Sequence, residues 1–270
     1  MKKLLKCLLI GLKCAWYLIG CYFAWILAYS NHPEKYPLEM RYRKVRKLVI
    51  FILKHARVDL RLRNPIELNT EESLFLVSNH MSALDPLFLV ALSEKPIRFV
   101  SKIENRKLPF AGRILMAMDS FFLDRDDPRQ AILIFREAYE TIQNKTAHVC
   151  IYPEGTRNRH PYEQDLGEFH PGSFKIPVKR KLDIYPVAIF GTQAIFGNDD
   201  FDHKHLIQVS FLDKLNADEV AAMKTTDLAE KLHDTMNKAF LDLRAKNIEY
   251  REKKEYKGKL HPWWKELPPL

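Results

Sequence analysis

Two side chains that can transfer protons lie close together in the first third of the chain. His80 and Asp85 are five positions apart within residues 78–86, which directly follow a short apolar run. A carboxylate that accepts the Nδ1 proton of an imidazole fixes the tautomer and leaves Nε2 free as a base near neutral pH. Spacing alone favours an arrangement in which Asp85 caps a helix and His80 is a loop residue. The pair alone therefore suggests general-base chemistry without establishing it.

Two later segments carry residue types that bind phosphate. Residues 122–125 end in Arg125, and residues 152–158 include Gly155, Thr156 and Arg157. A glycine lets the backbone approach a ligand closely, threonine offers a hydroxyl, and a guanidinium can donate two hydrogen bonds to one phosphate. Taken singly, each segment could be an ordinary turn with a surface arginine.

The predicted secondary structure brings these three segments to one place. Apolar runs predict strands at residues 73–78, 97–101, 121–124, 148–152, 183–190 and 206–211, and amphipathic or capped stretches predict helices at residues 84–92, 127–144 and 226–247. This alternation predicts an α/β fold with a mostly parallel or mixed central sheet that helices cover on both faces. Ligands of such folds bind at the loops that leave the carboxyl ends of the strands. His80, Arg125 and Gly155 each lie in such a loop.

Four sequence blocks occur in a fixed order along this predicted sheet. They are Asn-His-x-Ser-x-x-Asp at residues 79–85, Phe-x-x-Arg at 122–125, Tyr-Pro-Glu-Gly-Thr-Arg-Asn at 152–158 and Tyr-Pro-Val-Ala at 185–188. The set resembles the glycerolipid acyltransferases, specifically the lysophosphatidate (1-acylglycerol-3-phosphate) acyltransferases. The third block departs from the family pattern at Tyr152 and Asn158, which replace Phe and Ser, and its ionic and glycine positions are intact. Lys102 lies in a segment, residues 101–104, that is similar to the family's lysine segment.

The resemblance implies a direct acyl transfer. His80 would take the proton of a glycerol hydroxyl as that hydroxyl attacks an acyl thioester, and Asp85 would orient the imidazole ring. The expected reaction moves a fatty acyl group from an acyl-carrier protein or coenzyme A thioester to the sn-2 hydroxyl of 1-acylglycerol-3-phosphate, giving phosphatidic acid. No cofactor is implied beyond the thioester co-substrate. Transfer to glycerol-3-phosphate or another lysophospholipid, and a non-catalytic lipid-binding module, remain the alternatives.

The resemblance also implies which residues bind the substrates. Arg125, Arg157 and Lys102 would hold the acceptor phosphate, and Glu154 would fix these cations or the loop around it. Backbone amides near Gly155 would stabilise the oxyanion. The full set of candidate substrate-binding residues is Lys102, Arg125, Glu154, Gly155, Thr156 and Arg157.

Composition excludes several other classes of function. With 4 Cys among 270 residues, a disulfide scaffold is excluded. The 9 glycines form no Gly-x-Gly pair, so the dinucleotide fingerprint and the Walker A loop cannot be written. There is no His-Glu-x-x-His motif and no zinc-finger spacing of Cys and His, so no metal site is predicted.

The charge distribution indicates an anionic surface as a partner. The net charge is +9, from 43 Lys and Arg against 34 Asp and Glu, and the excess lies mainly near the two ends of the chain. Basic residues that flank apolar helices are typical of a protein held against an anionic bilayer. The nearly balanced middle of the chain argues against a nucleic-acid groove.

The first 56 residues are predicted to form a membrane-binding motif of two helices. Residues 14–29 contain no charge and span about 24 Å as a helix, less than the roughly 30 Å of a hydrocarbon core. A second, basic helix would place Tyr42, Val45, Val49 and Ile52 on one face. We expect a retained anchor that dips into one leaflet or lies along it, with a single spanning helix as the alternative and a cleaved signal peptide disfavoured.

The expected organisation has three parts. Residues 1–56 are the membrane-associated helices, residues 57–248 the acyltransferase domain, and residues 249–270 a basic, aromatic tail. Trp263 and Trp264 in this tail are expected to form an interfacial foot. The catalytic domain is expected at the cytoplasmic side of the cell membrane.

Overall fold

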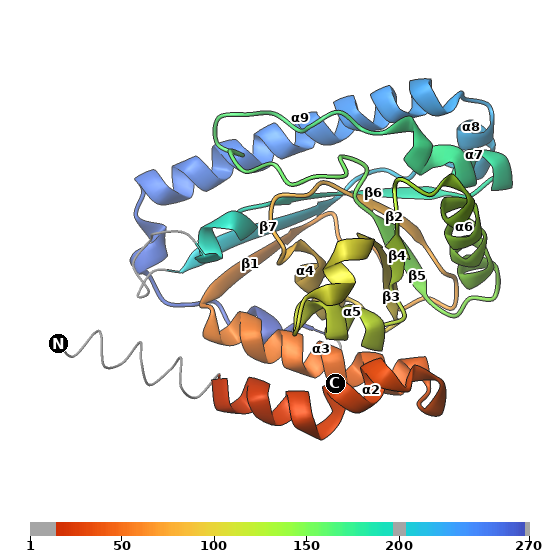
Figure 1. The fold of residues 1–270 in the computed structure, drawn as a ribbon. Helices are drawn as coiled ribbons and strands as arrows, with labels where there is room; N and C mark the ends of the chain where they lie inside the picture. Colours follow the sequence, from red (N-terminus) through yellow and green to blue (C-terminus); the bar gives the residue numbers. More distant parts are fainter. Residues whose placement is uncertain (1–14, 197–203, 268–270) are drawn as a thin grey trace.

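A seven-stranded sheet forms the centre of the molecule (Figure 1). The structure, a computed structural model, describes residues 15–196 and 204–267. The strands are β1 (Val58–Arg63), β2 (Phe75–Ser78), β3 (Ile97–Lys102), β4 (Phe121–Leu123), β5 (His148–Ile151), β6 (Ile184–Phe190) and β7 (His205–Phe211). Their order is β1-β7-β6-β2-β5-β3-β4, and of these pairs only β6 and β7 are antiparallel.

Helices cover both faces of this sheet (Figure 1). One group contains α2 (Leu27–Asn31), α3 (Leu38–His55), α4 (Asp85–Leu92) and α5 (Ala111–Ala117), and the other contains α6 (Pro128–Gln143), α7 (Lys175–Arg180), α8 (Ala217–Ala221) and α9 (Thr225–Glu252). Short turns are η1 (Tyr22–Ile26, π-helical) and the 3-10 segments η2 (Pro33–Lys35), η3 (Ile103–Lys107), η4 (Pro171–Phe174), η5 (Thr192–Phe196), η6 (Glu255–Lys257) and η7 (Trp263–Lys265). The predicted fold class is confirmed.

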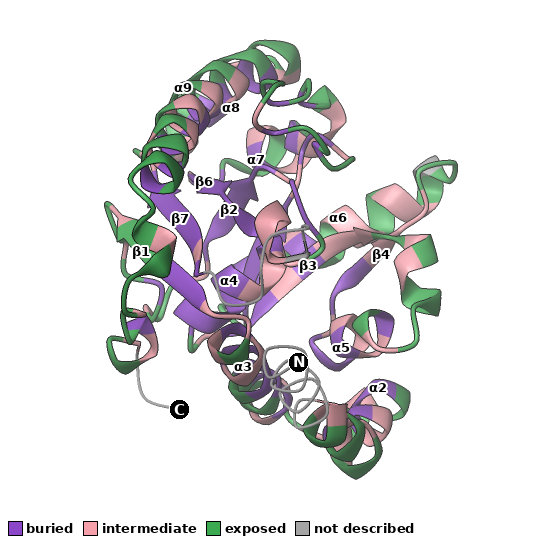
Figure 2. Cartoon of the chain, turned by 90° about the vertical axis from the view of Figure 1, so that its left-hand side faces the viewer, coloured by how far each residue is buried: buried purple, intermediate pink, exposed green. Residues whose placement is uncertain are grey.

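The six predicted strands are present, and β1 is the strand that the sequence did not predict. Its outer half alternates Arg61, Leu62 and Arg63, and it lies at the edge of the sheet, where it pairs only with β7. The central strands β2 and β5 are buried along their whole length (Figure 2). A continuous apolar run is readily recognised as a strand, whereas a short edge strand with charged side chains is not.

The predicted helices that follow the strands are also confirmed. Asp127 caps α6, since its carboxylate accepts hydrogen bonds from the backbone of Arg129 (2.9 Å) and Gln130 (3.1 Å). α9 buries one apolar face, formed by Leu228, Leu232, Met236, Phe240 and Leu243. The helix continues to Glu252, past the expected domain boundary at residue 248.

The apolar face of α3 belongs to the protein core and is not a lipid-facing surface, contrary to expectation. Tyr42, Val45 and Val49 are buried. Two of the basic residues of α3 are buried as well. Arg41 forms an ion pair with Asp119 (2.6 Å) and donates to the carbonyl of Ala117, while Arg46 donates to a carbonyl of α4. These contacts fix α3 against α4 and α5, so only its outer face is solvated.

The first helix leaves large apolar side chains in contact with solvent. Residues 15–31 form a continuous helix that includes η1 and α2. Trp16 is 75% exposed, Ile19 52% and Phe23 71%. Their spacing of three and four residues places them on one side of the helix. Residues 1–14, which include Lys2, Lys3, Lys6 and Lys13 of the predicted membrane-binding motif, lie outside the described residues. Within residues 15–196 and 204–267, no helix is both long and apolar enough to cross a bilayer.

The C-terminal tail is packed against the domain, so the expected interfacial foot is wrong for Trp263. Its side chain is 3% exposed, and its indole N–H donates to the carbonyl of Val58 (2.9 Å). Trp264 is half-buried and lies beneath the ammonium of Lys54, 5.2 Å from the ring centroid. The tail therefore covers the start of β1 and ties it to α3.

The connections after two neighbouring strands diverge at the carboxyl edge of the sheet. β2 and β5 are parallel neighbours, but the chain continues from β2 into α4 and from β5 toward α7, in opposite helix groups (Figure 1). In open α/β sheets, ligands usually bind where loops separate in this way. The segments after β2, β4, β5 and β6 all begin at this edge.

Candidate active site

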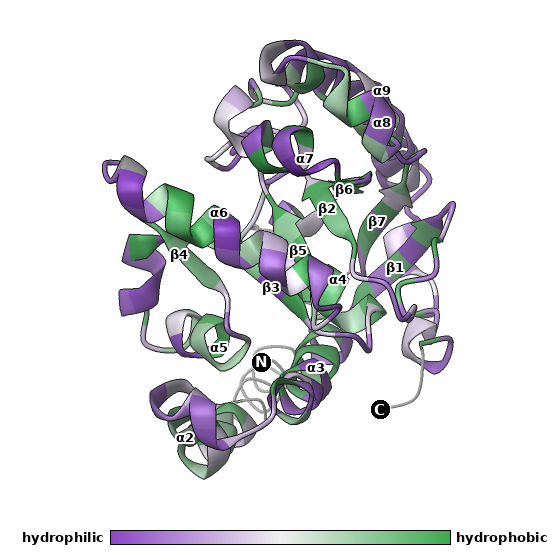
Figure 3. Cartoon of the chain, turned by 90° about the vertical axis from the view of Figure 1, so that its right-hand side faces the viewer, coloured by the Kyte–Doolittle hydropathy of each residue, from purple (hydrophilic) through white to green (hydrophobic). Residues whose placement is uncertain are grey.

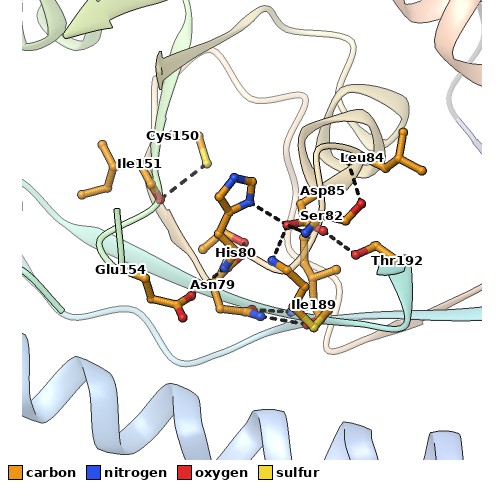
Figure 4. A network of polar contacts seen from close by, with 12 residues as sticks. Asn79, His80, Ser82, Leu84, Asp85, Cys150, Ile151, Glu154, Ile189 and Thr192 are labelled. Carbon is orange, nitrogen blue, oxygen red and sulfur yellow. Dashed lines mark hydrogen bonds and ion pairs between the residues drawn. The ribbon is translucent and has the colours of Figure 1, made fainter. Parts of the chain in front are cut away.

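The imidazole of His80 and the carboxylate of Asp85 are hydrogen-bonded, with 2.7 Å between Nδ1 and Oδ2 (Figure 4). Asp85 begins α4 and is completely buried, whereas the His80 side chain is 18% exposed. The same carboxylate oxygen accepts from the backbone amides of Met81 (2.7 Å) and Ser82 (2.8 Å). The loop from β2 to α4 therefore wraps around the carboxylate.

The second oxygen of Asp85 accepts a hydrogen bond from the hydroxyl of Thr192. The neighbours of the carboxylate are thus all donors, which is the environment of an ionised group. Because the carboxylate can only accept, the neutral His80 ring carries its proton on Nδ1 and leaves Nε2 as an acceptor. Figure 4 shows that this second nitrogen points away from Asp85. The arrangement can remove a proton from a hydroxyl that reaches Nε2.

Thr192 was missed by sequence reasoning, although it follows directly from the strand of the fourth block. It is fully buried at the start of η5. The turn before it depends on Gly191, which has φ +102, and a Cβ there would lie 2.1 Å from the carbonyl oxygen of Leu206. Only glycine fits this close approach. A glycine and a hydroxyl residue directly after a predicted buried strand were the available signal.

Asn79, the first residue of the first block, has a structural role. Its side-chain amide donates to the carbonyl of Ile189 (3.0 Å), and its side-chain oxygen accepts from the amide of Ile189 (2.7 Å). The residue is completely buried. These two bonds continue the β2–β6 pairing past the end of β2 and fix the position at which the His80 loop begins.

Glu154 holds the loop after β5 to the loop after β2. One carboxylate oxygen accepts from the backbone amide of His80 (2.7 Å) and the other from that of Gly167 (2.9 Å). The side chain is buried, and burial raises the pKa of its carboxyl while the two amides partly oppose that shift. The hydrogen bonds of Glu154 go to backbone amides and not to the cations, which matches the loop-fixing role among the two that were expected.

The ring of Tyr152 stacks on the imidazole of His80. The centroids of His80 and Tyr152 are 4.4 Å apart with planes 28° from parallel, and Phe99 lies beyond Tyr152. The family pattern has Phe at this position, and Tyr supplies the same flat surface. The amide of Asn158 also donates to the carbonyl of His80 (2.9 Å), so the third block supports the first through both side chain and backbone.

Arg125 and Gly155 are brought into direct contact. A guanidinium nitrogen of Arg125 donates to the carbonyl of Gly155 (2.6 Å). Gly155 has φ +65, and a Cβ there would lie 2.6 Å from that guanidinium and 3.0 Å from the ring of His170. Glycine is therefore required both by the backbone conformation and by the side chains packed on it. His170 also packs against Gly155, and sequence reasoning did not identify it.

The remaining candidate residues lie at the exposed rim. The Lys102 side chain pairs with Glu104 (2.7 Å). The pKa of Glu104 is lowered by this hydrogen bond and, to a smaller extent, by the charge of Arg125, so Lys102 and Arg125 share one electrostatic neighbourhood. Thr156 and Arg157 are exposed, and neither side chain has a hydrogen-bond or ion-pair partner in the described part of the chain. The structure thus joins His80, Asp85 and Glu154 by hydrogen bonds, and joins Arg125 to Gly155.

Cys150 is a cysteine two residues before the third block, and it is inert here. It is fully buried in β5, and burial raises the pKa of its thiol well above the ordinary range. A thiol is nucleophilic only as the thiolate. The arrangement therefore favours direct attack by a bound hydroxyl, with no covalent intermediate on this residue.

Comparison with known proteins agrees with the site. The family described as Acyltransferase matches residues 59–190, which contain all four blocks. A Mycoplasma pneumoniae protein named "Probable 1-acyl-sn-glycerol-3-phosphate acyltransferase" is 33% identical over 171 residues, 62% of each chain. The match to the Acyltransferase family covers just under half of the chain. The human 1-acyl-sn-glycerol-3-phosphate acyltransferase beta is 28% identical over 186 residues, 67% of this chain and 65% of the human one. The alignments thus span somewhat less than two thirds of these relatives' own lengths.

A solved structure shows the same fold. The 1-acyl-sn-glycerophosphate (LPA) acyltransferase PlsC from Thermotoga maritima superposes with a TM-score of 0.63, covering 90% of this chain and 98% of the other. The sequences are 18% identical over this alignment, so the likeness concerns the architecture.

Proposed function

We propose that the protein transfers a fatty acyl group from an acyl thioester to the sn-2 hydroxyl of 1-acylglycerol-3-phosphate, producing phosphatidic acid. The observation that carries the proposal is the His80–Asp85 pair. Asp85 is buried and accepts from His80, two backbone amides and Thr192, so the imidazole is held through Nδ1 and Nε2 is left for a substrate. The names of the relatives from Mycoplasma pneumoniae and human support the choice of acceptor.

In the proposed reaction, His80 Nε2 takes the proton of the acceptor hydroxyl as its oxygen bonds to the thioester carbonyl carbon. The C–S bond then breaks, and the proton leaves His80 for the sulfur, giving an ester and a free thiol. General-base assistance of this kind is typically worth about 10²–10⁴-fold in rate. Backbone amides in the loop at Gly155 are the donors proposed for the oxyanion.

The acceptor phosphate is proposed to bind at the exposed cations beside the His80–Asp85 pair. Arg125 donates to the carbonyl of Gly155, and Lys102 lies in the electrostatic neighbourhood of Arg125. Arg157 has no protein partner within the described residues. A guanidinium matches phosphate geometry and stays charged at all relevant pH values. The unpartnered state of Arg157 supports a role in binding a ligand.

The lipid acceptor is proposed to arrive from the surface of a bilayer. Trp16, Ile19 and Phe23 expose one apolar side of the first helix, and aromatic side chains favour the membrane interface. We place the catalytic domain at the cytoplasmic side, where acyl thioesters are available. The double variant Trp16→Ser/Phe23→Ser should sediment less with anionic vesicles, also at high salt, because burial of apolar surface is not screened by salt. Ile248→Ser, on exposed α9, is the matched control and should sediment as the unmodified protein does.

The proposal is tested by a panel of donors and acceptors on detergent-purified protein. Acyl-carrier protein and coenzyme A thioesters are each combined with lysophosphatidate, glycerol-3-phosphate and another lysophospholipid, and free thiol and lipid product are both measured. Thiol release that requires lysophosphatidate and yields phosphatidic acid is the expected result. Preference for another acceptor would replace the proposed substrate. Lipid binding without thiol release would indicate a non-catalytic binding module.

A further inference from the structure

A basic and apolar surface lies along α6 and α7, on the face of the sheet opposite to α3 and α4. Figure 3 shows the two helices side by side on this face. On α6, Ile132 is 67% exposed and Leu133 is 55% exposed. Arg129 and Arg136, also exposed, lie three or four residues away on either side of this pair. The same side of α6 therefore carries two aliphatic side chains between two arginines.

The adjoining helix α7 adds positive charge. Its exposed side chains Lys175, Lys179 and Arg180 are followed by exposed Lys181, and the segment contains no acidic residue. The guanidinium of Arg180 lies 4.8 Å from the ring centroid of Tyr139 on α6, which joins the two helices into one surface. We call this surface the α6–α7 face, defined by Arg129, Ile132, Leu133, Arg136, Lys175, Lys179, Arg180 and Lys181.

Within the described residues, the acidic side chains of α6 pair with one cation of this face, Arg136. Glu137 pairs with Arg98 on β3, and Glu140 lies 3.6 Å from Arg136. Lys175, Lys179 and Lys181 have no carboxylate partner within the described ranges of the chain. The face consequently keeps an excess of positive charge around its apolar centre.

Both helices begin beside the candidate active site. α6 is capped by Asp127, two residues after Arg125, and α7 follows η4, which begins directly after His170. Arg125 and His170 both pack against Gly155. A partner lying along the α6–α7 face would therefore have the Gly155 loop of the candidate active site at one end of its contact surface.

We infer that the α6–α7 face docks an acidic carrier protein that presents the acyl group as a thioester on a flexible arm. This inference rests on the proposed function, because it names the donor of that reaction. A protein with acidic helices is complementary to the exposed lysines and arginines, and such complementarity accelerates and orients association. Ile132 and Leu133 supply the apolar contact that an interface needs at its centre.

Other occupants fit this surface less well. The exposed apolar side of the first helix, with Trp16 and Phe23, belongs to the opposite helix group, so one flat bilayer seated there does not also cover α7 (Figure 1). The phosphates of coenzyme A would use the lysines but would leave Ile132 and Leu133 without a contact. A carrier protein uses both features.

The test compares two charge-reversal variants of the full chain. Lys175→Glu/Lys179→Glu changes the α6–α7 face, and Lys224→Glu/Lys238→Glu makes the same change in charge at exposed residues before and on α9. With lysophosphatidate as acceptor, kcat/KM is measured for acyl-carrier protein and for acyl-coenzyme A. The first variant should lose at least tenfold with the carrier thioester, through KM, and less than twofold with the coenzyme A thioester. The control should change less than twofold with either donor.

Several outcomes would overturn the inference. Equal losses with both donors would mean that the face binds the nucleotide phosphates or acts structurally, and transfer from coenzyme A but not from the carrier would exclude a carrier dock. Absence of transfer from both donors would count against the proposed function instead. Docking is then decided by fluorescence anisotropy with labelled carrier protein lacking the acyl group. Binding that weakens with salt and is lost in Lys175→Glu/Lys179→Glu supports the dock, and absence of binding by the unmodified protein rejects it.

Discussion

The two ends of the central strands each hold a histidine within hydrogen bonds, but with different results. His148, at the amino end of β5, is completely buried. Its Nδ1 accepts from the amide of Leu74 (3.0 Å), and its Nε2 donates to the carbonyl of Leu68 (2.7 Å). At the carboxyl end, His80 uses only Nδ1, and its partner is a carboxylate. Both ring nitrogens of His148 are hydrogen-bonded, whereas Nε2 of His80 has no hydrogen-bond partner among residues 15–196 and 204–267.

This difference separates a structural histidine from a catalytic candidate. Burial lowers the pKa of His148 to about 4, so the ring is neutral and both its nitrogens serve the fold. At His80 the carboxylate of Asp85 is available to stabilise the imidazolium that forms when Nε2 accepts a proton. At the carboxyl end of the strands, the carboxylate of Asp85 can therefore assist proton transfer by His80. At the amino end, the neutral ring of His148 links two backbone groups.

The largest expected effect on activity comes from removing the imidazole of His80. His80→Ala should lower kcat by about 10²–10⁴-fold, since the base is lost. The fold should persist because His80 is partly exposed and lies in a loop. Single-turnover transfer and urea unfolding measure the two consequences. Near-normal turnover in folded His80→Ala protein would contradict the proposed mechanism.

His148, whose two ring nitrogens are both hydrogen-bonded, should affect stability and not activity. The folded-state pKa of His148 is about 4, below the ordinary 6.5, so on acidification the unfolded chain takes up the proton first. Stability from this residue is thus present above about pH 6.5 and lost as pH falls toward 4, a loss of roughly 3 kcal/mol in total and about 2 kcal/mol between pH 7 and pH 5. Urea unfolding of wild-type and His148→Gln protein at the two pH values checks this. The same pH dependence in both proteins would assign it to other groups.

Weakening the support of Asp85 should have an intermediate effect. Thr192→Val keeps the shape but removes the donor to the second carboxylate oxygen. Hydrogen bonds to charged groups contribute about 1.5–3 kcal/mol, so kcat should fall about tenfold. With one donor fewer, the carboxylate is less firmly fixed in the orientation that holds the His80 ring. Thr192→Ser should restore kcat, and an unchanged kcat in the valine variant would mean that Thr192 only packs.

The smallest expected effect is at the exposed rim. Arg157→Lys keeps the charge but not the two-pronged geometry, so the KM for lysophosphatidate should rise about fivefold, or about 1 kcal/mol. The KM for the thioester should change less than twofold. Initial rates with each substrate varied separately measure both constants. Equal changes for the two substrates would assign Arg157 a role other than phosphate binding.

Much of this protein was determined by local features of the sequence. Continuous apolar runs predicted β2 and β5, the Asp127-Pro128 cap predicted the start of α6, and the order of the motif blocks indicated the family. These features act over a few residues or through burial of one face, so they can be recognised without knowledge of the fold.

Only the tertiary structure decided which partners each side chain has. Thr192 reaches Asp85 across 107 positions, and Glu154 reaches the amide of His80 across 74. The apolar face of α3 could have faced lipid or protein, and the ion pair of Arg41 with Asp119 fixes it against the protein. Amphipathic patterns state that a face must be buried but not by what, and hydrogen bonds between distant loops depend on strand order, which no local pattern contains.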